Sequence, residues 1–81
     1  MDYSYKTSGV CSRTIRFSLE DGTLKNVRFE GGCNGNLQGI ARLVEGMRAE
    51  DAAKKLEGIS CNGKPSSCPD QLAKAIRQAL N

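Results

Sequence analysis

The sequence predicts an α+β domain, a small antiparallel sheet with three helices packed on one face. Residues 3–31 contain runs that alternate between polar and apolar, which is the period of strands. From Leu37 onward the apolar residues recur at helical spacing, and Asp21-Gly22 is a typical tight-turn pair between two strand-like runs. Strands followed by helices indicate the α+β class, and the 81 residues are expected to form one domain, 1–81.

The strand region is expected to contain three segments. Residues 3–8 form a possible short edge strand, and residues 24–30 form a return strand with Val27 and Phe29 on one face. Between them lies a half-buried strand whose alternate residues share one side: Cys11, Arg13, Ile15, Phe17 and Leu19.

The hairpin register predicts where two cysteines lie. A turn centred on Asp21-Gly22 places Cys11 across from the neighbourhood of Gly32 and Cys33. Both thiols are therefore expected at the same end of the sheet.

The first helix is expected to start near Asn36, with Asn34 or Asn36 as its N-cap and Gly46 as its stop. Its apolar stripe is predicted from this spacing: Leu37, Ile40, Ala41, Leu43, Val44 and Met47. Cys33 would then lie just ahead of a helix N-terminus, where the positive end of the helix dipole favours a negative sulfur.

Two further helices follow in the second half of the chain. Residues 49–56 are predicted to be helical and to end at Gly58. After a loop rich in helix breakers, the last helix is expected to start at Pro69, with Cys68 or Ser67 as N-cap. Its apolar stripe is Leu72, Ala75, Ile76, Ala79 and Leu80.

Composition and charge exclude several classes of function. The formal net charge is +3, and basic residues are interspersed with acidic ones, so nucleic-acid binding is not expected. No apolar run approaches the roughly 20 residues of a membrane span, and residues 1–5 do not resemble a signal peptide. We therefore expect a cytoplasmic protein, whose cysteines are ligands, redox groups or buried fillers more often than permanent disulfides.

The four cysteines form the candidate site. Cys11, Cys33, Cys61 and Cys68 all fall at element ends or in a loop, which is where metal ligands are usually placed. Four thiolates suit zinc or an iron-sulfur cluster, and the absence of histidine removes mixed ligand sets and His-dependent triads. From spacing alone, the alternative that each cysteine is an inert buried hydrophobe stays open. No catalytic residue is predicted, and Gly31, Gly32 and Gly35 fit a turn better than a phosphate loop.

Nearly the whole chain resembles the stand-alone bacterial TSCPD-domain family. The resemblance depends on the motifs at residues 9–12, 31–37, 43–47 and 67–73. In the motif that names the family, Ser66 stands where the family has Thr. The resemblance implies kinship with a domain at the C-terminus of adenosylcobalamin-dependent ribonucleotide reductases. The chain is too short for a reductase barrel, a cobalamin site or a nucleotide site, so a reductase name would describe association and not an enzyme acting alone.

A remoter likeness is to the iron-sulfur cluster assembly scaffolds. Cys11, Cys33 and Cys68 match the three ligand cysteines of these scaffolds in order and context. Arg13 stands where the scaffolds have Asp and Ser67 where they have His, whereas Cys61 would add a fourth ligand. This likeness implies the scaffold fold, whereas the fourth ligand from Cys61, which the scaffolds lack, would make the site tighter and closed.

Three classes of function follow from these observations. The leading expectation is a metal-binding accessory module, with zinc or an iron-sulfur cluster as cofactor and a ribonucleotide reductase or another protein as partner. The second is a thiol-disulfide protein in which a pair such as Cys61 and Cys68 delivers electrons to a reductase. The third is an interaction module with inert cysteines, in which the loop at residues 59–67 carries the contacts.

Overall fold

The computed structural model describes residues 2–7, 12–31, 34–59 and 67–80, and it has three strands followed by three helices. In chain order, these elements are β1 (Asp2–Lys6), β2 (Ser12–Glu20), β3 (Thr23–Gly31), α1 (Asn34–Val44), α2 (Ala49–Leu56) and α3 (Cys68–Leu80). The predicted α+β class is therefore confirmed.

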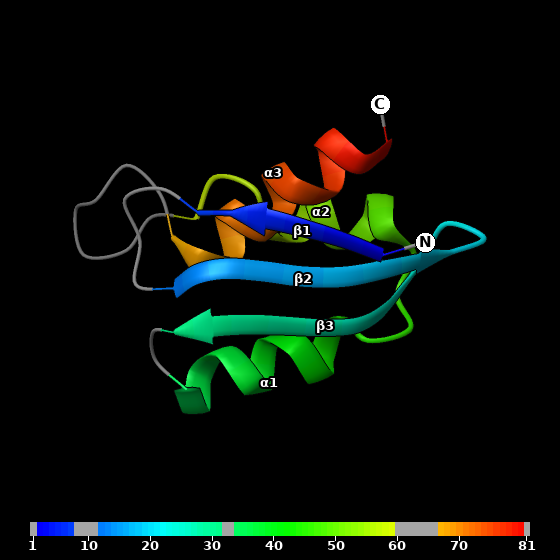
Figure 1. The fold of residues 1–81 in the computed structure, drawn as a ribbon. Helices are drawn as coiled ribbons and strands as arrows, with labels where there is room; N and C mark the ends of the chain where they lie inside the picture. The colour runs from blue at the N-terminus through cyan, green and yellow to red at the C-terminus, as the bar shows by residue number, and fades with distance from the viewer. Residues whose placement is uncertain (1, 8–11, 32–33, 60–66, 81) are drawn as a thin grey trace.

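The three strands form one antiparallel sheet in the order β1-β2-β3 (Figure 1). The β2–β3 hairpin turns at Asp21 and Gly22, whose φ angles are 53° and 78°. Positive φ at both central residues is the geometry of a two-residue hairpin turn that matches strand twist. Glu20 pairs with Thr23 across it, which confirms the predicted turn.

Two irregularities interrupt the hairpin register. One lies between Ser12 and Thr14 and gives β2 an extra residue, while the other lies between Arg16 and Ser18 and gives β3 an extra residue. Because the insertions fall on opposite strands, they cancel. Ser12 therefore pairs with Gly31, as in an uninterrupted hairpin.

The bulges change which side chains share a face. Leu24 and Val27 are both buried although they are three positions apart, because Asn26 (φ 54°) inserts a residue between them. The predicted common side for Arg13 and Ile15 is wrong: Ile15 is buried and Arg13 is exposed, because Arg13 is the extra residue of the other bulge. The rule that successive strand residues point to opposite faces of the sheet predicts neither change.

Glu45, just after α1, contacts the bulge in β3. Its Oε2 accepts a hydrogen bond from the backbone N–H of Asn26 at 3.1 Å, and its Oε1 accepts from Val27 at 3.5 Å. The side chain thereby satisfies backbone donors that the irregular ladder leaves out of the regular pairing.

Substituting Asn26 tests the backbone conformation of this bulge. We expect Asn26→Val to lower the free energy of unfolding by about 1–2 kcal/mol, because a β-branched residue resists positive φ. Asn26→Gly removes that restriction and should be close to neutral, so the pair separates backbone strain from loss of the side chain. Urea unfolding of both variants measures the difference, and equal losses would contradict this explanation.

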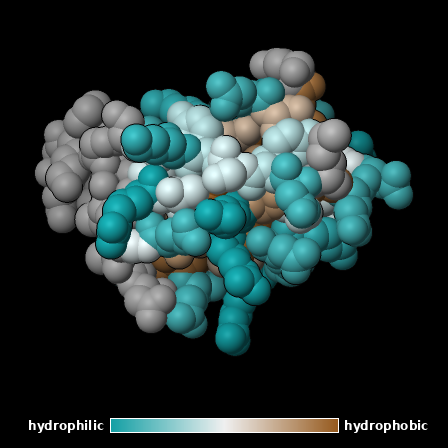
Figure 2. Space-filling model, viewed as in Figure 1, coloured by the Kyte–Doolittle hydropathy of each residue, from teal (hydrophilic) through white to brown (hydrophobic). Residues whose placement is uncertain are grey.

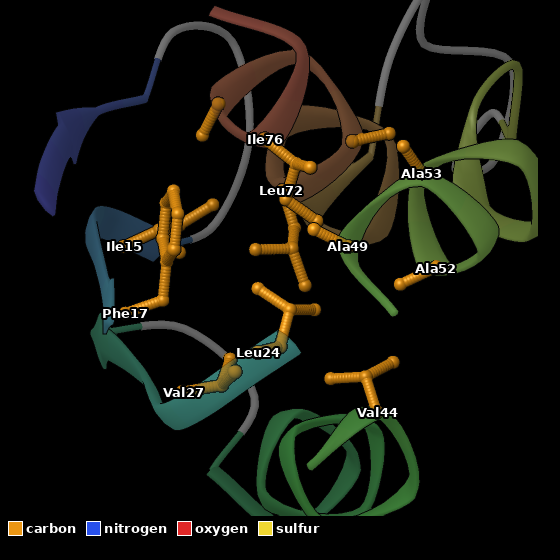
Figure 3. Close-up of a cluster of buried hydrophobic side chains, with 12 residues drawn as sticks. Ile15, Phe17, Leu24, Val27, Val44, Ala49, Ala52, Ala53, Leu72 and Ile76 are labelled. Atoms are coloured by element: carbon orange, nitrogen blue, oxygen red, sulfur yellow. The ribbon is translucent and has the colours of Figure 1, made fainter. Parts of the chain in front are cut away.

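All three helices lie on the side of the sheet toward which the buried strand residues point (Figure 3). In Figure 1, α1 runs along β3 while α2 and α3 pack together behind the sheet. The buried cluster between the layers consists of Ile15, Phe17, Leu24, Val27, Val44, Ala49, Ala52, Ala53, Leu72, Ala73, Ala75 and Ile76. The opposite face of the sheet is largely hydrophilic (Figure 2), with an ion pair between Arg16 Nε and Glu30 Oε1 at 3.3 Å.

The helix boundaries agree with the sequence in some places and correct it in others. The predicted bounds of α2 are confirmed, and Gly46 and Gly58 have the positive φ expected of helix stops, 82° and 84°. Helix α1 begins earlier than expected, at Asn34, so both predicted caps, Asn34 and Asn36, lie inside the helix and neither is its N-cap.

Two predicted members of the apolar stripes are also corrected. Leu43 is 79% exposed, because only a narrow face of α1, including Leu37 and Val44, meets the rest of the protein. Leu80, at the end of α3, is 45% exposed, beyond the part of the helix that packs on the core. Within the described ranges, no helix has the length and hydrophobicity needed to cross a membrane.

Candidate metal centre

The described segments that border the four cysteines meet at one end of the molecule. Figure 1 shows the ends of β1 and β3 and the starts of β2, α1 and α3 gathered on the left of the view. The segment that follows α2 reaches the same end. The hairpin register predicts that the start of β2 and the end of β3 lie at the same end of the sheet, and the pairing of Ser12 with Gly31 confirms this.

Cys11, Cys33 and Cys61 lie outside the described residues. Their described neighbours lie close together. Ser12, which follows Cys11 directly in the chain, pairs with Gly31, two positions before Cys33. Helix α1 begins at Asn34, the residue after Cys33, so the predicted position of Cys33 ahead of a helix N-terminus agrees with this boundary. Convergence of the thiols themselves stays a prediction.

Cys68 is the first residue of α3 and is buried, with 8% of its surface exposed. Ser67 is the N-cap, because its Oγ accepts a hydrogen bond from the N–H of Asp70 at 3.1 Å. The Ser67 carbonyl also accepts the first helical bond, from the N–H of Gln71 at 2.8 Å. Of the two predicted caps, the structure selects Ser67.

Pro69 is therefore the second residue of the helix and not the first, which corrects the predicted start of α3. Proline is tolerated at this position for the same reason as at the first position of a helix. The N–H groups of a helix's first turn have no partner within the helix, so the missing donor costs nothing.

Asp70 has a role that the sequence interpretation missed. The residue is only 5% exposed, and its Oδ1 accepts a hydrogen bond from the backbone N–H of Gly58 at 2.8 Å. Its Oδ2 lies 3.4 Å from Lys74 Nζ, one turn along α3. The only available hint was the spacing from Ser67 to an acid three residues later, which is typical of a helix start.

The part of the chain that the structure describes contains no group of three or more Cys, Asp or Glu residues placed to hold a metal ion. Cys68 is the one cysteine in that part. The predicted ligand set of Cys11, Cys33, Cys61 and Cys68 thus stays a prediction.

The structure defines a small α+β domain in which the described element ends next to the cysteines in sequence lie at one end of a three-stranded sheet. The family model of the TSCPD domain matches residues 2–80, and the chain therefore belongs to the TSCPD domain family. No match was found among curated proteins or among solved structures. The likeness to iron-sulfur scaffolds stays a prediction.

The family's characteristic segment can now be described in physical terms. Ser67 caps α3, Pro69 fits its first turn, and Asp70 binds the backbone at Gly58. These three residues fix the start of a helix. Neither capping nor helix formation requires a thiol. They therefore do not explain why the segment contains Cys68.

Proposed function

We propose that this protein is a cysteine-thiolate metal-binding module, with zinc as the first choice of cofactor and an iron-sulfur cluster as the second. One observation carries the proposal: the described ends of β1, β2, β3, α1 and α3, which border the cysteines in sequence, meet at one end of the sheet. The pairing of Ser12 with Gly31 supports a short separation between Cys11 and Cys33.

The donor set fits a structural site better than a catalytic one. Four thiolates complete the tetrahedral shell of zinc and leave no open position for water or substrate. Zinc–sulfur distances of about 2.3 Å require the four sulfurs to lie within about 4 Å of one another. The burial of Cys68 fits a closed site of this kind.

The metal would supply folding free energy to a chain with a small core. A structural metal is a common means of stabilising domains of this size. We infer that the residues Cys11, Cys33, Cys61 and Cys68 hold the metal, while Ser67 and Asp70 fix the helix on which Cys68 lies.

Membership in the TSCPD family supports a role near ribonucleotide reduction. The family is related to the C-terminal domain of adenosylcobalamin-dependent ribonucleotide reductases, so we propose that the module is an accessory partner of a reductase and not an enzyme by itself. A cytoplasmic location, where thiols stay reduced and available to metals, suits this role.

Metal content tests the proposal directly. Protein purified without oxygen should contain one zinc ion per chain by elemental analysis, and cobalt substitution should give thiolate-to-metal absorption. Each single Cys→Ser variant should lose metal affinity, whereas Ser60→Ala, one position from Cys61, should not. The absence of zinc, of iron with inorganic sulfide and of the cobalt-thiolate band would contradict the proposal. A disulfide between Cys61 and Cys68 that cycles with a reductase would favour the thiol-redox alternative.

A further inference from the structure

We infer that Asp70 is the positioning residue for Cys68: its carboxylate joins the exit of α2 to the first turn of α3 and thereby holds Cys68 at the start of α3. The inference about Cys68 depends only on the described contacts. Its extension to metal affinity rests on the proposed function.

The carboxylate joins two backbone positions that are far apart in sequence. Asp70 Oδ1 accepts the N–H of Gly58 at 2.8 Å, across 12 positions. Gly58 has a φ of 84°, so the chain leaves α2 through a left-handed turn at the residue that donates this bond. The contact fixes the exit of α2 to the first turn of α3.

The same residue also takes part in the cap of α3. Its backbone N–H donates to Ser67 Oγ at 3.1 Å, and its Oδ2 pairs with Lys74 at 3.4 Å. Cys68 therefore lies between two residues, Ser67 and Asp70, that are hydrogen-bonded to each other. Asp70 links that pair to α2.

The physical effect is preorganisation. Closing a segment of about ten residues costs entropy, and a contact that already joins its ends removes that cost from a later binding step. Hydrogen bonds to a charged acceptor are stronger than neutral ones, and a carboxylate near a helix N-terminus is further favoured by the helix dipole. Cys61 and Cys68 both lie between Gly58 and Asp70 in the sequence.

The test compares Asp70→Ala, Asp70→Asn and the matched control Asp51→Ala. Asp51 lies in the first turn of α2 and is exposed, so its substitution removes a first-turn carboxylate without breaking a contact between helices. The first measurement is the alkylation rate of Cys68 in reduced, metal-free protein, read by mass spectrometry of its peptide. The second is zinc affinity by chelator competition.

Asp70→Ala should raise the alkylation rate about tenfold, the effect of losing one charged hydrogen bond. It should also weaken zinc binding about 10- to 100-fold, which is typical of residues that orient metal ligands. Asp70→Asn keeps an acceptor for Gly58 but loses the charge that strengthens this bond and pairs with Lys74, so it should differ from the parent by about threefold on both measurements, clearly less than Asp70→Ala. Asp51→Ala should change neither.

Three results would overturn the inference. One is an unchanged alkylation rate in Asp70→Ala, or a rise no larger than the rise in the global unfolding constant measured in urea. Another is equal damage from Asn and Ala, and the third is full zinc affinity in Asp70→Ala when the parent protein binds zinc. A parent protein that binds neither zinc nor an iron-sulfur cluster would defeat the proposed function, yet the alkylation comparison would still decide the role of Asp70.

Discussion

Replacing Leu72 with Ala is expected to lower the free energy of unfolding by about 2–5 kcal/mol. Leu72 is completely buried in the cluster between α3 and the sheet, so truncation removes apolar contacts and leaves a cavity. A chain of 81 residues has a total stability of about 4–12 kcal/mol at typical values per residue. The variant should therefore be marginally folded, as urea unfolding with a constant slope would show.

Leu43→Ala is the matched control for this experiment. Leu43 lies on α1 and is 79% exposed, so the same chemical change should cost less than about 0.5 kcal/mol. Similar losses from the two substitutions would mean that the assignment of the core to one face of the sheet is wrong.

Removing zinc from the loaded protein is expected to be the second large effect. A ligand that binds only the folded state, at a free concentration about 1,000 times its dissociation constant, contributes about 4 kcal/mol. For a domain of this size, that corresponds to a fall of about 15–30 °C in the thermal midpoint on chelation. Added zinc should restore the midpoint.

The cysteine variants supply the control for the chelation experiment. Cys33→Ser and Cys68→Ser should have a low midpoint that the chelator no longer changes, because they no longer hold the metal. Ser60→Ala should respond as the parent does. A loaded parent protein whose midpoint is unaffected by chelation would show that the metal is not part of the folded structure.

The hairpin and α2 were predictable from sequence because local chemistry decides them. Asp21-Gly22 favours the positive φ angles of a two-residue turn, and the segment at α2 has acidic residues in its first turn and basic ones in its last. Neither depends on a distant part of the chain. The turn and the bounds of α2 were confirmed as predicted, whereas β3 extends one residue beyond each end of the predicted return strand, from Thr23 to Gly31.

The bulges and the exposed helix positions were not predictable in this way. Helical spacing groups Leu43 with Val44, but the width of the face of α1 that is covered depends on how the helix lies along β3. Alternation likewise assigns Leu24 and Val27 to opposite faces, until the extra residue at Asn26 brings them to the same one. The packing partners decide both outcomes.

The candidate site also combines features that the sequence predicts with features that depend on packing. The α+β class and the TSCPD family could be predicted from residue order and short motifs alone. The meeting of the bordering element ends at one end of the sheet, and the contact of Asp70 with Gly58, depend on the packing of the elements. The contact between Asp70 and Gly58 spans 12 positions and depends on the packing of α2 against α3. Residue spacing alone does not predict that packing.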